Sequence, residues 1–584
     1  MGRWRSSRSS SRLPVAPQPF ESRTVDELPI SLAPRMSTEP SSSDSLGASL
    51  FARFFSIDVR ALAAFRIGLA LLILVDLSFR SLYLEAHYSD AGILPRGVLN
   101  QYAGGMVGSI YMLHGSTWFA GLLFVVTAIL AVMLLVGYET RLATFWCWAM
   151  VASLHSRHTN VLNGGDSLFC LLLFWSIFLP LGATASIDNL RRPRPAGAPL
   201  KVCSIATFAL LMQIIVVYLC TGLKKVHPFW YSDAIALWLA LHIDQFTTRF
   251  GLWVRELPFW VLKVATIVTF WFEVLGWLLV FVPFKTAFFR IVAVILFIAL
   301  HVGISSMMNV GLFSATCIVA WMTFLPTEFW NWLSRLAPSR WLVGTVRGAV
   351  VRTLRIEPAA EPADGVDPIT RPTPMTERWV LGAVVLLVAW YNLAGFERFE
   401  HLKLPGLIGE VTRALRLEQD WAMFSPHPPA HDGWYVVPAT LVDGSQVDLY
   451  GLVDGGSFEL TWDRPAYIMP TFPTQRWRKY LNNIWLEHKQ RKYTEHFGNY
   501  LRNKWNSLNP PEKQIKSMAI YMFVEYTHSP GVDPMYSREL MYEWEGDDDW
   551  RVVSFDDSIA NLKRKARALD KLPPTFQIRR LGPE

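Results

Sequence analysis

The chain has 584 residues, of which 52% are hydrophobic and 14% aromatic, and this composition is too apolar for an ordinary soluble protein of its length. Several apolar runs approach the ~20 residues that a helix needs to cross a bilayer. The formal net charge of +7 comes mainly from a basic tail and from connections between apolar runs, which is how membrane orientation is encoded, so we expect no nucleic-acid binding.

The first element along the chain is a polar tail, residues 1–53, which is rich in Ser, Arg and Pro and contains no apolar run. We predict a disordered, basic, cytoplasmic tail without a cleavable signal peptide. The five cysteines all lie in or beside later apolar runs, so we expect buried thiols and neither a disulfide framework nor a zinc site.

Nine apolar segments follow, and they predict an all-α polytopic membrane bundle of about nine transmembrane helices. The third and fourth are short, which indicates tilted or interior helices. Tyr231–Asp244 is too short and too amphipathic to span, so we expect it to lie in the interface or to re-enter the membrane. The nine segments are 58–80, 118–137, 142–156, 167–182, 202–221, 259–283, 287–304, 311–326 and 378–395.

Lysine and arginine in the connections predict the orientation. Basic residues concentrate in the tail, in Arg191–Lys201, at Lys285 and Arg290, and in Arg335–Arg355, and all of these fall on one side if nine spans alternate. The positive-inside rule makes that side cytoplasmic. We therefore predict a multi-pass protein of the cell (plasma) membrane, with a cytoplasmic N terminus and an extracytoplasmic C-terminal domain.

The chain divides into parts after its transmembrane domain, residues 54–330. A basic cytoplasmic linker, 331–376, leads to a last transmembrane helix, 377–398, and then to an extracytoplasmic α+β domain, 399–584.

Within that domain, alternation around an Asp-Gly turn predicts a hairpin over 433–453, and a further apolar run predicts a strand over 517–527. Helical spacing of apolar residues predicts helices over 476–506 and 558–572.

Four polar connections fall on the predicted outer side, and their convergence predicts a functional site at that face. One of them, Tyr218–Trp230, reads "YLCTGLKKVHPFW" and places two lysines against the positive-inside bias. These lysines either snorkel to the lipid headgroups or serve a site. The other three connections are Glu85–Arg96, Ser156–Ser167 and His301–Gly311.

Two ionised side chains, Arg66 and Glu273, fall within predicted spans, where an unpaired charge is costly. We predict that they pair with each other across the bundle as a structural element. The alternative is that one of them faces a water-filled crevice.

The same connections carry motifs with a family resemblance. "FRIGLALLILVDLSFR", "HYSDAGILPR", "NVLNGGDSLF", "YLCTGLKKVHPFW" and "HVGISSMMNVGLFS" together resemble the HTTM family of bacterial membrane proteins, which are similar to the vitamin K-dependent gamma-glutamyl carboxylase. The resemblance covers residues 54–330. "LEQDWAMFSPHPP" and the region after it resemble the C-terminal part of the same proteins.

The resemblance implies lyase and quinol epoxidase chemistry, with reduced vitamin K or another quinol as cofactor and no metal. The family's known enzyme oxygenates reduced vitamin K, the oxygenated quinol removes a proton from a glutamate γ-carbon, and carbon dioxide adds to that carbon. A lysine in a Gly-x-Lys-Lys segment is the base for the quinol, and it corresponds to Lys225. An apolar pocket favours a neutral amine, and the neighbouring charge of Lys224 acts in the same direction.

The chain departs from the carboxylase where that enzyme has an Asn-His-Ser segment with a catalytic histidine. This sequence reads "LNGGDSLF", so Asp166 is the nearest counterpart, at the same position or offset by one residue, and His158 is the nearby imidazole. The propeptide-recognition region of the animal enzyme is not recognisable either. These departures weigh against gamma-carboxylation of a protein substrate and favour quinone binding or quinol oxidation. A protein substrate remains one of the possible partners.

Two hypotheses differ on whether the chain is an enzyme. In the first it is an enzyme with Lys225 as the base and with Phe229 and Trp230 as walls of an apolar quinone pocket. The supporting polar groups in that hypothesis are Lys224, His227, Asp166, His158 and His301.

In the second hypothesis the protein is non-catalytic and binds or transports a quinone or lipid, or serves in assembly. Lys224 and Lys225 then hold anionic lipid headgroups, or pair with Asp166 and Asp233. A metal centre is not expected, because His155 and His158, spaced i and i+3, lack a clear third ligand.

Overall fold

The computed structural model describes residues 42–102, 108–195, 197–336, 374–486, 488–528, 530–546 and 550–552, together with 345, 348 and 352. The chain divides into two units, Met1–Leu50 and Phe51–Glu584, at a boundary inside helix α1 (Ser42–Phe55). The predicted disordered tail lies outside the described residues, apart from its end in α1. Most of the predicted linker and all of the predicted helix over 558–572 also lie outside them.

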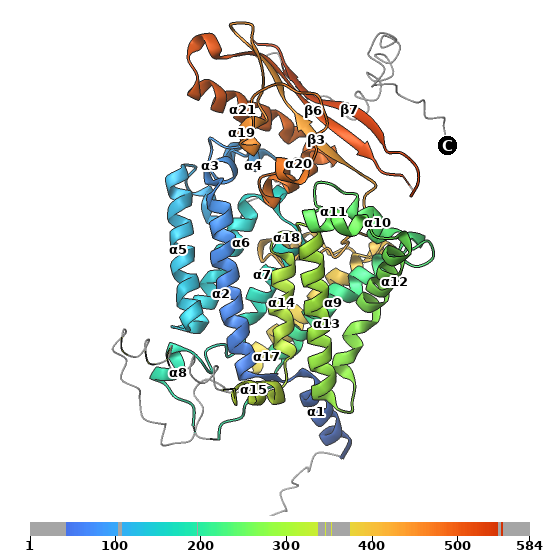
Figure 1. Ribbon diagram of the computed structural model, residues 1–584. Helices are drawn as coiled ribbons and strands as arrows, with labels where there is room; N and C mark the ends of the chain where they lie inside the picture. The colour runs from blue at the N-terminus through green and yellow to red at the C-terminus, as the bar shows by residue number, and fades with distance from the viewer. Residues whose placement is uncertain are drawn as a thin grey trace, which may run out of the picture. The chain divides into compact units, whose positions relative to one another are not determined.

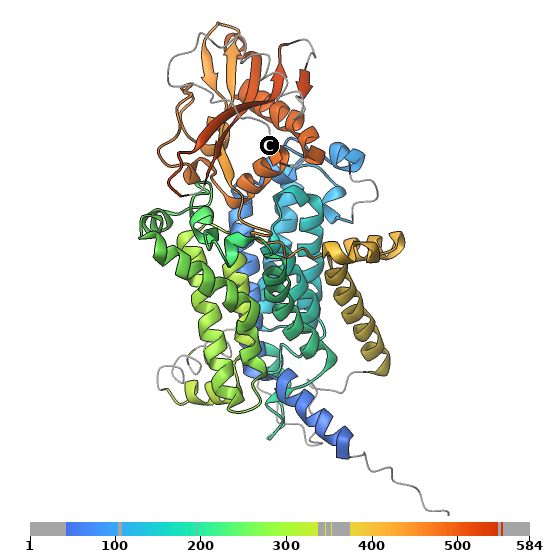
Figure 2. The ribbon, with the colours of Figure 1, turned by 90° about the vertical axis from the view of Figure 1, so that its right-hand side faces the viewer.

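A bundle of apolar helices forms the first part of the larger unit (Figures 1 and 2). A helix lies in each of the nine predicted segments, and six of the described helices are long and apolar enough to cross a membrane, so the chain is a multi-pass membrane protein. The three shorter helices are α6 (Thr140–Arg157), α7 (Gly164–Ser176) and α14 (Phe313–Trp321). The six long ones are α2 (Val59–Ser81), α5 (Thr117–Val136), α9 (Ile205–Lys224), α12 with η4 (Phe259–Phe281), α13 (Thr286–Met307) and α17 (Met375–Ala394).

Local signals in the sequence explain where these helices begin and end. Ser204 opens α9 with a capping box, in which its hydroxyl accepts a hydrogen bond from the Thr207 amide. Asn163 opens α7 in the same way together with Asp166. Gly137, at φ 69°, ends α5 in the left-handed conformation that glycine adopts without strain.

The bundle is apolar both inside and outside. Leu69 of α2, Leu172 of α7 and Ile215 of α9 are fully buried in one core cluster. Large apolar side chains also cover outward faces, for example Val125 of α5 and Val268 of α12, which is 61% exposed. Exposed aliphatic faces are unfavourable in water but not in lipid, so this distribution fits a bilayer.

Short helices occupy both ends of the bundle. The segment Tyr231–Asp244 contains only α10 (Ala236–Leu241), which confirms that it does not span. Strands β1 (Ile57–Asp58) and β2 (Lys201–Val202) pair next to the starts of α2 and α9.

The other short α-helices are α3 (Leu84–Tyr88), α4 (Arg96–Tyr102), α8 (Ile187–Arg191), α11 (Arg249–Arg255), α15 (Thr327–Leu333), α18 (Gly406–Ala414) and α19 (Gly451–Asp454). The short 3-10 helices are η1 (Ile110–Met112), η2 (Thr159–Val161), η3 (Pro228–Trp230), η5 (Met322–Phe324), η6 (Glu397–Leu402), η7 (Met469–Thr471), η8 (His488–Tyr493) and η9 (Pro511–Lys513).

A six-stranded antiparallel sheet with two helices forms the C-terminal part of the unit, orange and red in Figure 1. Strand β6 is central: β7 pairs along one edge, while β4 and β3 share the other. Helices α20 (Gln475–Leu486) and α21 (Thr494–Leu508) bury Trp477, Tyr480 and Phe497 in the core of this part. The strands are β3 (His431–Val436), β4 (Pro438–Leu441), β5 (Gln446–Asp448), β6 (Ile515–Tyr526), β7 (Met535–Trp544) and β8 (Trp550–Val552).

The predicted hairpin and strand of this part are confirmed. β4 pairs with β5 across the turn that contains Gly444, at φ 85°, and the predicted strand coincides with most of β6. The sheet part joins the end of the bundle at which α2 and α9 terminate (Figure 1). There the Asn483 side chain donates to the Asn160 carbonyl oxygen at 2.9 Å, and Lys504 pairs with Glu85 at 2.7 Å.

A buried carboxyl group, Asp432 on β3, lies at this junction. Its Oδ2 accepts a hydrogen bond of 3.0 Å from the Gln245 amide, and the residue is only 2% exposed. Burial first, and then the neighbouring carboxylate of Asp244, raise the pKa of Asp432 from 3.8 to about 8. In the folded protein Asp432 therefore keeps a proton that the unfolded chain releases at much lower pH.

Asp432 is expected to make the protein less stable as pH rises from about 4 to about 8, because the folded state binds the extra proton across this window. Asp432→Asn cannot ionise. The stability difference between the variant and the wild type should therefore grow in favour of the variant by up to about 1.4 kcal/mol per pH unit, and stop growing above about pH 8. Unfolding of the purified protein in detergent across this range measures it, with Asp533→Asn as the control at an exposed carboxylate. Parallel pH profiles for Asp432→Asn and wild type would contradict the prediction.

Candidate functional site

Helix α9 ends at Lys224 and is capped by Lys225, whose side chain is buried (3% exposed) rather than directed into solvent. Its ammonium group forms an ion pair with the Glu273 carboxylate of α12 and lies 3.9 Å from the centre of the Trp230 ring. Gly222, one turn earlier, permits this approach, because a Cβ there would lie 2.8 Å from a methyl group of Val274. The two helices are thus in close contact where the charges pair.

The Trp230 ring beside this ion pair belongs to a small aromatic cluster. Trp230 and Phe270 are buried in one small apolar cluster, and Phe229 and Phe424 pack against it. The Trp230 indole N–H donates to the Phe424 carbonyl oxygen at 3.2 Å, which holds the ring in place. An ammonium group over a desolvated indole face gains about 2 kcal/mol of electrostatic attraction, so the ring helps to hold the Lys225 head group in place.

Residues 419–427, from the motif "LEQDWAMFSPHPP", cover the end of α9. Lys224 Nζ donates to the Asp420 carboxylate at 2.8 Å, and the His227 ring lies 4.7 Å from the His427 ring. The sequence did not predict this contact, because 196 residues separate Lys224 from Asp420 and no local pattern links them.

The predicted pairing of Arg66 with Glu273 is wrong. The Arg66 guanidinium donates instead to the carbonyl oxygens of Leu181 and Ala185, at 3.2 and 2.5 Å, and Glu273 pairs with Lys225. Arginine has five donors and can be satisfied by neutral carbonyl groups, whereas a buried carboxylate needs a cation.

The two pairings that the non-catalytic hypothesis offered for the lysines are also wrong. Asp166 and Asp233 are not their partners, which are Glu273 and Asp420. Because Lys225 is buried, snorkelling does not describe it either. A buried ammonium group pairs with the carboxylate on the helix packed directly against it, and for α9 that helix is α12.

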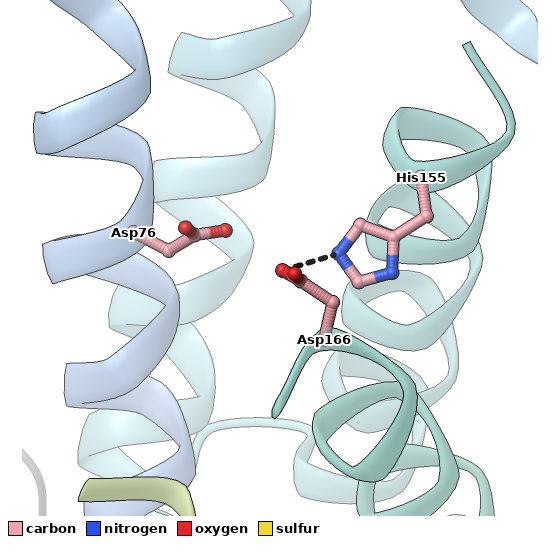
Figure 3. A group of neighbouring side chains, drawn as sticks. All are labelled: Asp76, His155 and Asp166. Carbon is pink, nitrogen blue, oxygen red and sulfur yellow. Dashed lines mark ion pairs between the residues drawn. The ribbon is translucent and has the colours of Figure 1, made fainter. Parts of the chain in front are cut away.

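Asp166 belongs to a separate group of buried charges (Figure 3). Asp76 of α2 and Asp166 at the start of α7 lie close together, and His155 Nε2 of α6 is 3.6 Å from an Asp166 oxygen. Arg80 donates to Asp76 at 2.7 Å and to Asp166 at 2.9 Å, while Arg476 of α20 binds both carboxylates. Two carboxylates are thus balanced by two guanidinium groups.

This group has the spacing of a metal site, but its carboxylate donors are already occupied. Ligand atoms of Asp76, His155 and Asp166 lie within 4.8 Å of one another. All four carboxylate oxygens, however, already accept a hydrogen bond from Arg80 or Arg476. A cation placed among them would face two guanidinium groups, so the donor set fits an ion-pair lock. Held by two arginines, Asp166 is also a poor replacement for a catalytic imidazole.

His158 is buried among aromatic rings and not beside Lys225. Its ring lies 5.5 Å from that of His87 on α3 and 5.7 Å from that of Tyr480 on α20. Burial lowers the pKa of His87 to about 3 and holds the pKa of His158 well below its usual value, so both imidazoles are neutral. His155, its predicted i, i+3 companion, contacts the Asp166 group instead.

His301 lies in a third buried network, contributed by α9, α13 and α14. Its Nε2 is 2.6 Å from the Tyr218 hydroxyl group, which also accepts a hydrogen bond of 2.9 Å from the Trp321 indole. Phe297 stacks on Trp321 at 3.8 Å. Since Tyr218 precedes Lys225 by two helical turns, this network positions the helix that carries the lysine.

The structure therefore brings five of the predicted site residues together at the end of α9, while Asp166, His158 and His301 lie in other groups. Sequence reasoning missed Glu273 and Asp420 as the partners of the lysines. For Glu273 a signal existed, because an ionised residue in an apolar span requires a partner. The five are Lys224, Lys225, His227, Phe229 and Trp230.

Comparisons with known proteins identify the domain that holds these groups. Residues 54–330 match the family model of the HTTM domain, and this range contains both the Lys225–Glu273 pair and most of the Asp166 group. No match was found among curated proteins or among solved structures. The chain is therefore a membrane protein with a segment, residues 54–330, that matches the HTTM domain, the domain found in vitamin K-dependent carboxylase-like proteins.

Proposed function

We propose that this HTTM protein is an enzyme that binds a quinol beside Lys225 and uses the Lys225–Glu273 pair as its acid–base group. The observation that carries the proposal is the buried ion pair against the Trp230 ring. Ionisable groups within a membrane domain are costly, and they commonly serve binding or proton transfer. Here they lie in an aromatic setting that suits a planar, apolar ligand.

The surrounding residues fit a quinol. Phe229, Trp230, Phe270 and Phe424 offer aromatic faces for its ring. The outward face of α12 is apolar and exposed, as at Val268, so a hydrophobic tail has a route from this cluster into lipid. When bound, the quinol supplies the electrons for a reaction with dioxygen.

The ion pair can move a proton without adding net charge to the membrane domain. Lys225 Nζ donates to Glu273 Oε2. Transfer of that proton leaves a neutral amine beside a neutral carboxyl group, and the amine can then accept a proton from a quinol hydroxyl group. The Trp230 face stabilises the ammonium group that results.

A non-catalytic quinone- or lipid-binding protein is the second candidate, and one observation favours it. Asp166 stands near the position of the histidine segment of the related carboxylase, but it is bound to Arg80 and Arg476. A reaction that needs a second base would have to find it elsewhere. This weighs most against carboxylation of a protein substrate.

Lys225→Arg is expected to abolish quinol-dependent oxygen consumption, because a guanidinium group stays protonated at any relevant pH. Lys224→Arg is the matched control at the adjacent lysine, whose partner Asp420 is 74% exposed, and it should reduce turnover without abolishing it. Oxygen uptake is measured with the purified full-length protein and reduced vitamin K, and quinone binding is followed in parallel by quenching of tryptophan fluorescence.

The outcomes separate the two candidates. Wild-type turnover in Lys225→Arg contradicts the catalytic role of the lysine. Quinone binding without turnover in the wild type supports the non-catalytic candidate, and the absence of both binding and turnover would overturn the assignment of a quinone ligand.

A further inference from the structure

A cavity of about 1080 Å³ lies at the end of α9 opposite to Lys225, beside the capping residue Ser204. The described residues that line it come from the starts of α6, α9 and α17, from the segment after α7, and from α8. In Figure 1, α8 lies at the end of the bundle remote from the sheet. The cavity is therefore separate from the proposed quinol site, and nothing below depends on that proposal.

Charged groups contribute to the lining of the cavity, and cations predominate among them. Asp188 is already engaged, since it accepts hydrogen bonds of 2.9 and 2.7 Å from the amides of Glu139 and Thr140. Glu377 lies 3.6 Å from Arg141. The lining thus contains four arginines and three carboxylates, which belong to Glu139, Asp188 and Glu377, and Asp188 already caps the start of α6. The arginines are Arg141, Arg191, Arg192 and Arg378.

Apolar side chains also line the cavity, and some of them are exposed on the outside of the bundle. Leu142, Phe145 and Phe178 line the cavity. Leu142 and Phe145 are also exposed on the outer face of α6, as is the neighbouring Trp146. A ligand with a polar end at the arginines can therefore extend an apolar part directly into the bilayer.

We propose that this cavity binds an anionic phospholipid, with its phosphate at the arginines and its acyl chains along Phe145 and Phe178. The excess of guanidinium groups selects an anion, and the apolar wall selects an amphipathic ligand over free phosphate. The positive-inside rule assigns this end of the bundle to the cytoplasmic leaflet, where anionic lipids concentrate beside basic residues.

The test compares binding of phosphatidylglycerol and phosphatidylcholine to the purified full-length protein by native mass spectrometry. Wild type is expected to prefer phosphatidylglycerol, and Arg141→Gln/Arg192→Gln should weaken its binding about tenfold, because each basic group near an anionic lipid contributes appreciably. Lys285→Gln/Arg335→Gln removes two exposed cations outside the cavity and should leave the preference unchanged. Equal losses of phosphatidylglycerol binding in both double variants would overturn the proposed site, because the lipid preference would then reflect the overall charge of the protein.

A second measurement has its deciding readout in the wild type, which does not depend on how the variants fold. Cys203 lines the cavity and is exposed, whereas the other four cysteines are buried. Maleimide labelling of Cys203 in phosphatidylcholine vesicles should slow several-fold when phosphatidylglycerol is added, and Arg141→Gln/Arg192→Gln should lose this protection. Unchanged labelling of wild type would overturn the proposal. Protection by inorganic phosphate alone would also overturn it and assign a free anion instead.

Discussion

Lys225→Met is expected to destabilise the protein by about 3–5 kcal/mol, because it leaves the Glu273 carboxylate buried without a cation. The free energy of unfolding in mixed detergent micelles measures this loss. Lys224→Met is the matched control one residue away. Its partner Asp420 is largely exposed, and a surface ion pair contributes at most about 1 kcal/mol.

The double variant Lys225→Met/Glu273→Met distinguishes the effect of removing the whole ion pair from the effect of leaving one of its charges without a partner. Replacing both members of a buried ion pair by apolar groups of similar volume is often neutral, so the double variant should recover most of the stability. The difference between the double variant and the sum of the single variants then gives the coupling between the two residues. If Lys225→Met costs no more than Lys224→Met, the lysine is not buried against Glu273.

The sequence predicted the helices of the bundle well because each is encoded locally. An apolar run long enough to cross a bilayer, bounded by a capping residue such as Ser204 or a glycine such as Gly137, specifies a helix without reference to the rest of the fold. The same holds for the hairpin across Gly444. The six candidate spans do not include α7 and α14, which are shorter, or α6, which has 18 residues but is less apolar.

The candidate site was predicted only where its residues are neighbours in the chain. Lys224 to Trp230 form one motif, and their proximity follows from the backbone. Glu273 and Asp420 reach the same place through helix packing and through the segment that covers α9, and neither contact has a period or spacing in the sequence. The rule that a membrane charge needs a partner identified Glu273 as important, but it could not choose between Arg66 and Lys225.

Arg476→Met is expected to cost about 3–5 kcal/mol and to loosen the sheet part from the bundle. Arg476 is buried, binds Asp76 and Asp166, and donates to the Val161 carbonyl oxygen at 3.1 Å. Without it, two buried carboxylates share Arg80 alone and repel each other. Unfolding in mixed micelles gives the free energy, and hydrogen exchange of the α20 amides should rise. Lys516→Met, at an exposed lysine of β6, is the control and should change neither.

Arg476→Met also distinguishes an ion-pair lock from a metal site, because removal of the arginine frees the carboxylates of Asp76 and Asp166. In a lock, the added substitution Asp76→Asn restores charge balance with Arg80 and should recover part of the lost stability, and a chelator should have no effect on the wild type. In a metal site with His155, a chelator would reproduce the loss seen in Arg476→Met, and Asp76→Asn would add to it. We expect the first pattern, since both guanidinium groups already occupy the oxygens that a cation would need.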